Sequence, residues 1–411
     1  MKRSYRELFT AVGLVVLSVF SLSACGGVGP TSEGAPETLA ANAAPEVSLE
    51  ISTTDLKRGV RAVATVNGAP SGSLRYSWDF GDGTVKEGES ESEHAYAISG
   101  SYTVTVSVSD AQESTSARQE VSVAHLRPED APDALVVGFA GRCGLEIVLV
   151  GCAAPDDNEG YLDDDDAQSV QAIAETLEDL GYSVSWLNGR AHLESKADSD
   201  SLGMGYKDIA DFMEFAKTSW ISDFDNPTRL VLVGHSHGAV WASLLAWNFP
   251  ELTFDYAVYL DGICRLWWDD QKPYFVREFD RAGERRPFPL DENRVLGPCK
   301  ALRVPGRLRQ DIEDVTPDNV VIGLEVQAGT FVPRDLEPNR RQSGDTSDLY
   351  TIVSKDPHFG SRAVYVRGRE SMNWVTQSIA TLGLSGSDLS TMSTLDLRER
   401  VPAPEGFEYA D

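Results

Sequence analysis

Basic residues are scarce in this chain of 411 residues, which carries 36 Lys and Arg against 64 Asp and Glu and a formal net charge of −28 at pH 7. Proteins that bind nucleic acid need a basic face for the phosphates, and docking on anionic lipid also needs positive charge. The composition therefore argues against both kinds of partner. The acidity is best explained by a solvated surface, and it identifies no substrate.

Cysteine is scarce too, with five residues in the chain. No C-x-x-C pair or histidine cluster accompanies the cysteines, so we expect no metal site and no cofactor. The acidic run Asp163–Asp166 is a minority candidate for calcium, but its spacing fits no EF-hand loop. It lies at the start of a predicted helix, where the helix dipole favours carboxylates in any case.

The apolar run Leu8–Leu22 is too short to predict a membrane span, and it follows basic residues, which is typical of a targeting segment. Leu22-Ser23-Ala24-Cys25 closes this run and resembles the lipobox of bacterial lipoproteins. The resemblance implies that residues 1–25 are a signal peptide and that Cys25 is lipidated. Gly26 replaces the aspartate of inner-membrane retention, which implies the outer membrane. An ordinary secretory signal with a chance cysteine is the alternative.

The remaining cysteines are Cys143, Cys152, Cys264 and Cys299. An even number in an exported protein predicts two disulfides, for which three pairings are formally available. The pairing between sequence neighbours joins Cys143 to Cys152 and Cys264 to Cys299.

A chain of this length predicts two or more domains. Residues 26–44 are rich in Gly, Pro, Ala, Ser and Thr, so we expect a flexible tether. Residues 45–124 alternate apolar and polar positions between turn residues, which predicts a small all-β sandwich. Residues 125–133 contain prolines and charges and are expected to form a linker.

The segment Tyr76–Thr84, YSWDFGDGT, is followed by His94-Ala95-Tyr96 and then by Gly100–Val106, GSYTVTV. This pattern closely resembles the PKD domain, an immunoglobulin-like sandwich. The resemblance implies a spacer or a weak adhesion module on a secreted bacterial enzyme, with contact to surface polysaccharide or protein as its interaction.

From residue 134 the pattern changes to strands that alternate with helices, which predicts a doubly wound, mostly parallel sheet over residues 134–383. Strands are expected at Leu135–Phe139, Tyr182–Leu187, Leu230–Val233, Phe254–Leu260, Val320–Gln327 and Leu349–Val353, and helices at Asp166–Leu180, Tyr206–Trp220, Ala239–Trp247 and Gly368–Leu382. Residues 263–319 are an insertion rich in aromatic residues, which either caps a site or packs on the core. Residues 384–411 are polar, so we expect an irregular tail.

Gly234-His235-Ser236-His237-Gly238 lies between a predicted strand and a predicted helix. The glycines allow strand and helix to approach closely, so that the Ser236 hydroxyl is exposed on a strained turn and the His237 N–H can stabilise an oxyanion. This stretch resembles the nucleophile elbow of the α/β-hydrolase superfamily. The resemblance implies an α/β-hydrolase fold, Ser236 as nucleophile, and a second oxyanion donor from Phe139 or Ala140.

A serine nucleophile needs a histidine base and a carboxylate that orients it. His358 follows the last predicted strand and precedes the last helix, where this superfamily carries its base. The other histidines lie outside this domain, precede Ser236 or belong to the elbow: His94, His125, His192, His235 and His237.

The acid has two candidates. Asp261 ends the strand after the elbow helix, a position that resembles the catalytic aspartate of pancreatic-type lipases. Asp335 lies one strand later, where most other α/β-hydrolases place the acid. An Asp-Gly pair such as Asp261-Gly262 also occurs as an ordinary turn, so the preference for Asp261 is slight.

Together these residues predict a serine hydrolase that cleaves carboxylic esters, in the lipase or esterase class, on an ester-containing small molecule or lipid. Two alternatives stay open. The same triad serves amide and thioester hydrolysis, and a lipoprotein with an inactive hydrolase domain would serve in binding or adhesion.

Overall fold

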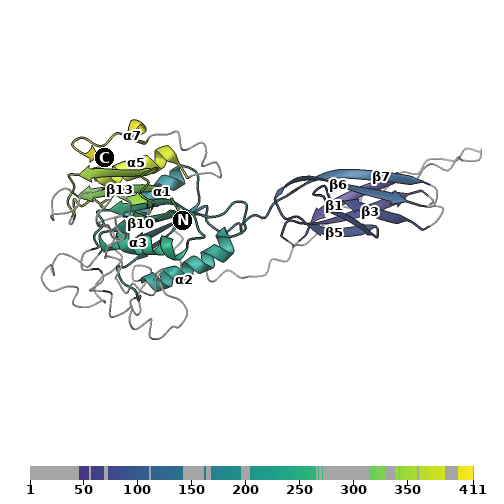
Figure 1. Cartoon of the computed structure of the whole chain (residues 1–411), viewed down its shortest axis with the longest axis horizontal. Coiled ribbons are helices and arrows are strands. Elements are labelled where there is room, and N and C mark those ends of the chain that lie inside the picture. The colour runs from purple at the N-terminus through teal and green to yellow at the C-terminus, as the bar shows by residue number, and fades with distance from the viewer. Residues whose placement is uncertain are drawn as a thin grey trace, which may run out of the picture. The chain divides into compact units, whose positions relative to one another are not determined.

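The computed structural model describes residues 46–54, 57–68, 73–110, 113–141, 162, 168–195, 204–264, 267, 271, 315–328, 338–341, 343–358, 361–384 and 397–410. These residues form two compact units (Figure 1). One contains the described residues up to Leu126 together with Asp223–Asn226, and the other contains the rest.

The first unit is a sandwich of two antiparallel sheets. One sheet has the order β1 (Glu46–Thr53), β2 (Gly59–Asn67), β5 (Glu91–Ala95), and the other has the order β4 (Val85–Gly88), β3 (Arg75–Asp79), β6 (Gly100–Ser109), β7 (Ser114–Val123). Alternate residues of β6, namely Val104, Val106 and Val108, are buried between the sheets with Trp78 and Phe80. The period-two alternation in the sequence therefore marks the inner face.

The Asp- and Gly-rich stretch after β3 forms a tight turn. The Asp79 carboxylate accepts the N–H of Gly81 at 2.9 Å, and that of Asp82 accepts the N–H of Thr84 at 2.9 Å. The φ of Gly81 is +78°, and a Cβ there would lie 2.7 Å from the carbonyl oxygen of Thr103. His94 contacts Asp82 at 2.7 Å, so its ring belongs to the structure of this unit.

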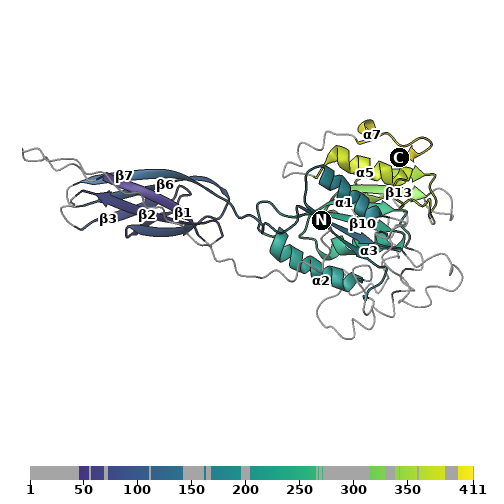
Figure 2. The same cartoon turned by 180° about the vertical axis from the view of Figure 1, so that it is seen from behind.

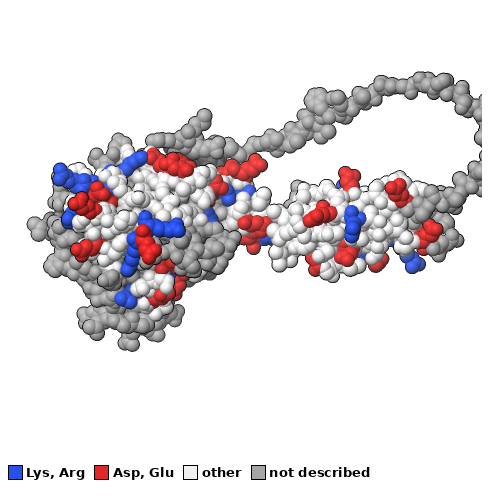
Figure 3. Space-filling view, turned by 90° about the horizontal axis from the view of Figure 1, so that it is seen from above, with Lys and Arg blue, Asp and Glu red and all other residues white. Residues whose placement is uncertain are grey.

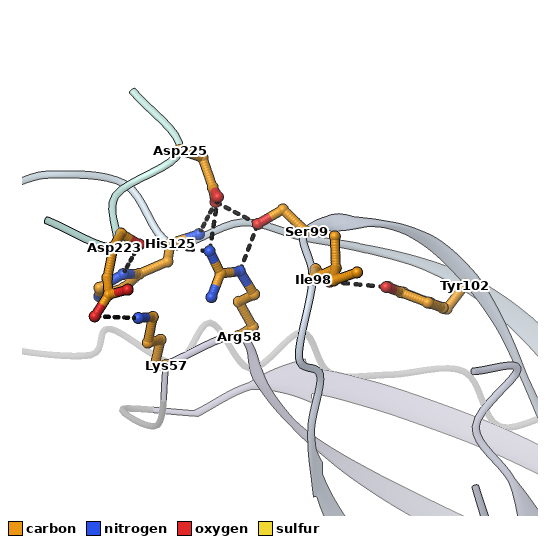
Figure 4. A network of polar contacts seen from close by, with 8 residues as sticks. All are labelled: Lys57, Arg58, Ile98, Ser99, Tyr102, His125, Asp223 and Asp225. Carbon is orange, nitrogen blue, oxygen red and sulfur yellow. Dashed lines mark hydrogen bonds and ion pairs between the residues drawn. The ribbon is translucent and has the colours of Figure 1, made fainter. Parts of the chain in front are cut away.

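Asp223–Asn226 come from the segment between α2 and β10 and join the first unit through a polar network (Figure 4). The Asp225 carboxylate accepts hydrogen bonds from Ser99, from Arg58 at 2.8 Å and from the N–H of His125. These bonds, above all the one from Ser99, lower the pKa of Asp225 to about 2.

The second unit contains a seven-stranded sheet of order β16-β15-β13-β11-β10-β8-β9. All neighbours are parallel except β15 and β16. The strands are β8 (Ala134–Phe139), β9 (Val184–Gly189), β10 (Arg229–His235), β11 (Phe254–Leu260), β13 (Val320–Ala328), β15 (Leu349–Ser354) and β16 (Glu408–Tyr409). A short parallel pair, β12 (Val315–Thr316) with β14 (Arg340–Arg341), accompanies the sheet.

Helices cover both faces of this sheet (Figure 2). The apolar residues of α1 (Ser169–Asp179) and α5 (Glu370–Leu382) are buried in one core, and those of α2 (Tyr206–Ala216) and α3 (His237–Asn248) in the other. Along β8, alternate residues enter opposite cores, since Leu135 and Val137 belong to the second and Val136 to the first. A strand buried on both faces explains the unbroken apolar runs in the sequence.

The chain reverses its direction of travel across the sheet at β8. From β8 it passes to the edge strand β9, and it then returns to β10 on the opposite side of β8. In open parallel sheets such a reversal leaves a crevice at the carboxyl ends of the two strands, where ligands bind. The carboxyl ends of β8 and β10 are Phe139 and His235.

Two of the expected segments contain more ordered structure than the sequence pattern indicated. Part of the expected linker 125–133 packs on the second unit, because Ala131 is buried in its core and Asp133 accepts the N–H of Ser183 at 2.7 Å. The expected irregular tail instead contains α7 (Leu397–Arg400) and β16, with Leu397, Val401 and Phe407 buried. These apolar residues are too widely spaced to stand out in a polar segment. The strand β16 that follows them pairs with the edge of β15, whose backbone groups would otherwise be unpaired there.

Within the described ranges, no helix is long and apolar enough to span a membrane.

Candidate active site

Ser236 occupies a strained turn between β10 and α3. Its φ and ψ are 53° and −123°, a conformation that is costly for a residue with a side chain. Three backbone hydrogen bonds hold it there: the Ser236 N–H donates to the Leu260 carbonyl at 3.2 Å, and the Ser236 carbonyl accepts from Ala239 at 3.1 Å and Ile263 at 3.2 Å. The turn is therefore fixed from both β11 and α3.

The two glycines of the elbow are required by close approach. A Cβ on Gly234 would lie 2.6 Å from backbone atoms of Ala239, and a Cβ on Gly238 would lie 1.9 Å from the carbonyl oxygen of Phe139. Gly238 thus lets the first turn of α3 rest against the carboxyl end of β8.

His358 connects Ser236 with Asp261. Its Nε2 lies 3.2 Å from the Ser236 Oγ, and its Nδ1 is hydrogen-bonded to the Asp261 Oδ2. All three side chains are buried, with relative exposures of 3%, 1% and 0% for Ser236, His358 and Asp261. A carboxylate can only accept, so Nδ1 carries the proton and Nε2 presents its lone pair to the serine hydroxyl.

The Asp261 carboxylate is held by the end of β13. Its Oδ1 accepts the N–H of Ala328 at 2.8 Å, while the N–H of Asp261 donates to the carbonyl of Val326 at 2.6 Å. One carboxylate oxygen is thus bound to the sheet and the other to His358. Asp335, the alternative acid, lies outside the described residues, so Asp261 is the aspartate that the structure places against His358.

The loop that carries His358 is tied to the start of α5 by Asp356. This buried carboxylate accepts from the Arg369 side chain and, at 3.1 Å, from the Ser371 N–H. No sequence motif singles out Asp356. The sequence shows only an aspartate at position 356 and an arginine at position 369, at the start of a predicted helix. Such a pattern is common on protein surfaces and does not indicate a buried ion pair.

The expected oxyanion donors differ in their geometry. His237 is the first residue of α3, where helix N–H groups point away from the helix. The N–H of Ala140 donates to the Gly189 carbonyl at 2.8 Å, so it is committed to the sheet and does not suit the expected role. Phe139 ends β8, with its carbonyl beside Gly238.

Other expected features fall largely outside the described residues. Cys264 is buried and disulfide-bonded, whereas Cys25, Cys143, Cys152, Cys299 and most of the 263–319 insertion are not described. In the described part of the chain, no group of three or more His, Cys, Asp or Glu side chains is arranged to hold a metal ion.

Comparison with known proteins identifies the first unit. Residues 42–124 match the family model of the PKD domain. The PKD1 domain of Vibrio anguillarum Epp is 28% identical over 20% of this chain and 95% of that one, with a TM-score of 0.18. The PKD1 domain of the Vibrio cholerae metalloprotease PrtV is 29% identical over 20% and 96%, with a TM-score of 0.18.

The PKD domain of human SorCS2 is 18% identical over 26% of this chain and 96% of its own, with a TM-score of 0.18. No curated protein matches the chain. The chain therefore carries a PKD domain at residues 42–124, which confirms the PKD-like sandwich predicted at residues 45–124. A unit built on a large, mainly parallel sheet follows it.

Proposed function

We propose that the second unit is a serine hydrolase of the α/β-hydrolase superfamily that cleaves carboxylic esters. The observation that carries this proposal is the continuous hydrogen-bonded chain from the Ser236 hydroxyl through His358 to Asp261. Its members follow β10, β15 and β11, so the carboxyl ends of three parallel strands supply one site. A buried carboxylate, imidazole and hydroxyl in this order is the arrangement that activates a serine.

In the proposed mechanism, the Ser236 oxygen attacks the ester carbonyl carbon while His358 Nε2 takes the hydroxyl proton. The N–H of His237 stabilises the oxyanion of the tetrahedral intermediate. His358 then donates its proton to the leaving alkoxide, which departs as the alcohol and leaves an acyl-Ser236 ester. Water attacks this ester with His358 as base, and the carboxylic acid and free Ser236 result. Asp261 keeps the imidazole in the required tautomer throughout.

Ester turnover by the full chain tests the proposal. Ser236→Ala and His358→Ala should each lower kcat for p-nitrophenyl esters by a factor on the order of 10⁴ or more. Because the two residues act as a unit, the double variant should be little slower than either single variant. Thioester and anilide analogues with the same acyl chain show whether esters are preferred. Equal rates for wild type and Ser236→Ala would refute the proposal, and no turnover of any analogue would favour the binding or adhesion alternative.

We also propose that the protein is a lipoprotein of the outer membrane, lipidated at Cys25, with the PKD domain as a spacer or a contact site for surface polysaccharide or protein. The Leu22–Cys25 lipobox pattern and the following PKD domain support this. Cys25→Ala should move the protein from the membrane fraction to the soluble fraction. Unchanged membrane association of this variant would refute the anchor.

A further inference from the structure

His235 lies directly before Ser236 and its ring is completely buried, with 0% relative exposure. Its Nε2 lies 3.1 Å from the main-chain carbonyl oxygen of His358. A carbonyl oxygen can only accept, so Nε2 of His235 carries the proton and donates it to His358. The side chains of both neighbouring elbow residues therefore contact His358: Ser236 contacts its imidazole ring, and His235 contacts its main-chain carbonyl.

The His235 ring also packs against two aromatic rings, which orients its Nε2 toward the His358 carbonyl. The His235 ring centroid lies 4.7 Å from that of His358 and 4.3 Å from that of Tyr365. His358 and Tyr365 both lie in the loop that joins β15 to α5, and within this loop the Val364 N–H donates to the Pro357 carbonyl at 3.0 Å. The imidazole of His235 thus packs against the loop while it binds the loop's backbone.

From this geometry we propose that His235 is a positioning residue, which holds the backbone of His358 so that Nε2 stays within reach of the Ser236 hydroxyl. This inference rests on the proposed hydrolase function. Asp261 fixes the far side of the His358 ring, and a ring held at one nitrogen can still tilt. A second anchor on the main chain of the same residue removes that freedom, and a displacement of about 1 Å in such a site costs about 100-fold in rate.

Substitutions at position 235 separate the hydrogen bond from packing. The amide nitrogen of Gln is as many bonds from Cα as the Nε2 of His, so His235→Gln keeps a donor at the right reach. His235→Met has nearly the same length and shape without the donor. His235→Asn is smaller, and its amide reaches only the position of Nδ1.

We expect His235→Met and His235→Asn to lower kcat by about 10- to 100-fold with KM nearly unchanged, and His235→Gln to stay within about fivefold of wild type. If His235 contributed only packing, the His235→Gln variant would not have a higher kcat than the His235→Met variant. If the His235→Met variant does not fold, the kcat of His235→Gln is compared with that of the smaller His235→Asn variant instead. Equal kcat for Gln, Met and Asn variants of equal thermal stability would overturn the proposal.

Hydrogen exchange of a peptide that spans residues 355–366 gives a readout that needs no catalysis. Exchange should be faster than in wild type for the Met and Asn variants and unchanged for Gln. If wild type turns over no ester, the proposed function fails, and this exchange pattern alone decides whether His235 holds the loop. Identical exchange in all variants would show that it does not.

Discussion

Ser236 and Asp261 both have a φ of 53°, although neither is a glycine. Such backbone conformations persist only where surrounding contacts impose them, and they concentrate at functional sites. In this protein, backbone hydrogen bonds supply the contacts that impose these conformations. Leu260, which accepts from the Ser236 N–H, immediately precedes Asp261, and Asp261 in turn donates to Val326. The two strained residues are therefore fixed by one shared segment at the end of β11.

Asp261→Asn should lower kcat by about 10⁴-fold while the protein stays folded. Asn tolerates positive φ nearly as well as Asp, and its amide oxygen can still accept from Ala328, but its NH₂ group no longer accepts from His358 Nδ1. Steady-state kinetics and thermal unfolding measured together check this prediction. Asp335→Asn is the matched control and should keep its activity; a large kinetic loss there, with Asp261→Asn active, would contradict our choice of the acid.

At the scale of elements, the loop between β15 and α5 carries His358, and Asp356 binds this loop to the start of α5. Asp255 offers a matched control, because it is similarly buried and pairs with Arg229. This pair lies at the amino-terminal ends of β11 and β10, whereas the catalytic candidates follow the carboxyl ends of their strands. The side-chain exposures of the two pairs are similar, at 3% and 35% for Asp356 and Arg369 and 1% and 25% for Asp255 and Arg229.

Asp356→Ala and Asp255→Ala should each lower the free energy of unfolding by about 1.5–3 kcal/mol, because each removes charged hydrogen bonds from a buried site. Only Asp356→Ala should also lower kcat of the folded enzyme, by at least about tenfold, since it frees the loop that carries His358. Denaturant unfolding and kcat measured below the unfolding midpoint separate the two effects. An equal kinetic loss in both variants would show that the Asp356 effect is one of general stability.

The main strands and helices of the second unit follow from the sequence because each is an apolar run or an amphipathic segment bounded by turn residues. Phe254–Leu260 coincides with β11, and the expected strand at Leu135–Phe139 differs from β8 by one residue. The elements that escaped prediction are the ones without such a pattern. β16 is defined by its pairing with the edge strand β15, and in α7 the isolated apolar Leu397 is buried in the core that also contains α5.

The residues of the candidate site also fall into those that the sequence indicates and those that it does not. Ser236 and His358 are identifiable because a short motif and a position in the strand order point to them. The choice between Asp261 and Asp335 depends on which strand end faces His358, and the sequence contains no such information. The contacts of His235 and Asp356 escaped prediction for a related reason, since both bind backbone or helix-terminal groups that leave no periodic trace.

At the scale of the whole molecule, acidic side chains are spread over the visible surface of both units with Lys and Arg between them (Figure 3). Asp225 differs from these dispersed charges, because its carboxylate is bound by Ser99, Arg58 and His125 within the first unit (Figure 4). A sequence-based boundary at residue 124 leaves Asp225 out of that unit, although its network belongs to it.

Asp225 should make the first unit sensitive to acid. Its pKa is lowered to about 2 in the folded protein, from about 3.9 in an unfolded chain. The stabilisation is therefore fully present above about pH 4 and is lost as the pH falls through about 2. Calorimetry should show that Asp225→Asn lowers the unfolding temperature at neutral pH and matches wild type near pH 2. Asp223→Asn, at a carboxylate that is 77% exposed, should have little effect at either pH; a constant deficit of Asp225→Asn at all pH values would contradict the linkage.

The central claim is that Ser236 is an activated nucleophile, and reaction with a fluorophosphonate tests it most directly, because an ordinary serine does not react. We predict that mass spectrometry of the full chain will show one phosphonyl adduct, located on the peptide that contains Ser236, with no adduct on Ser236→Ala and slow labelling of Asp261→Asn. Absence of an adduct on the folded wild type, or an equal adduct on Ser236→Ala, would contradict the account.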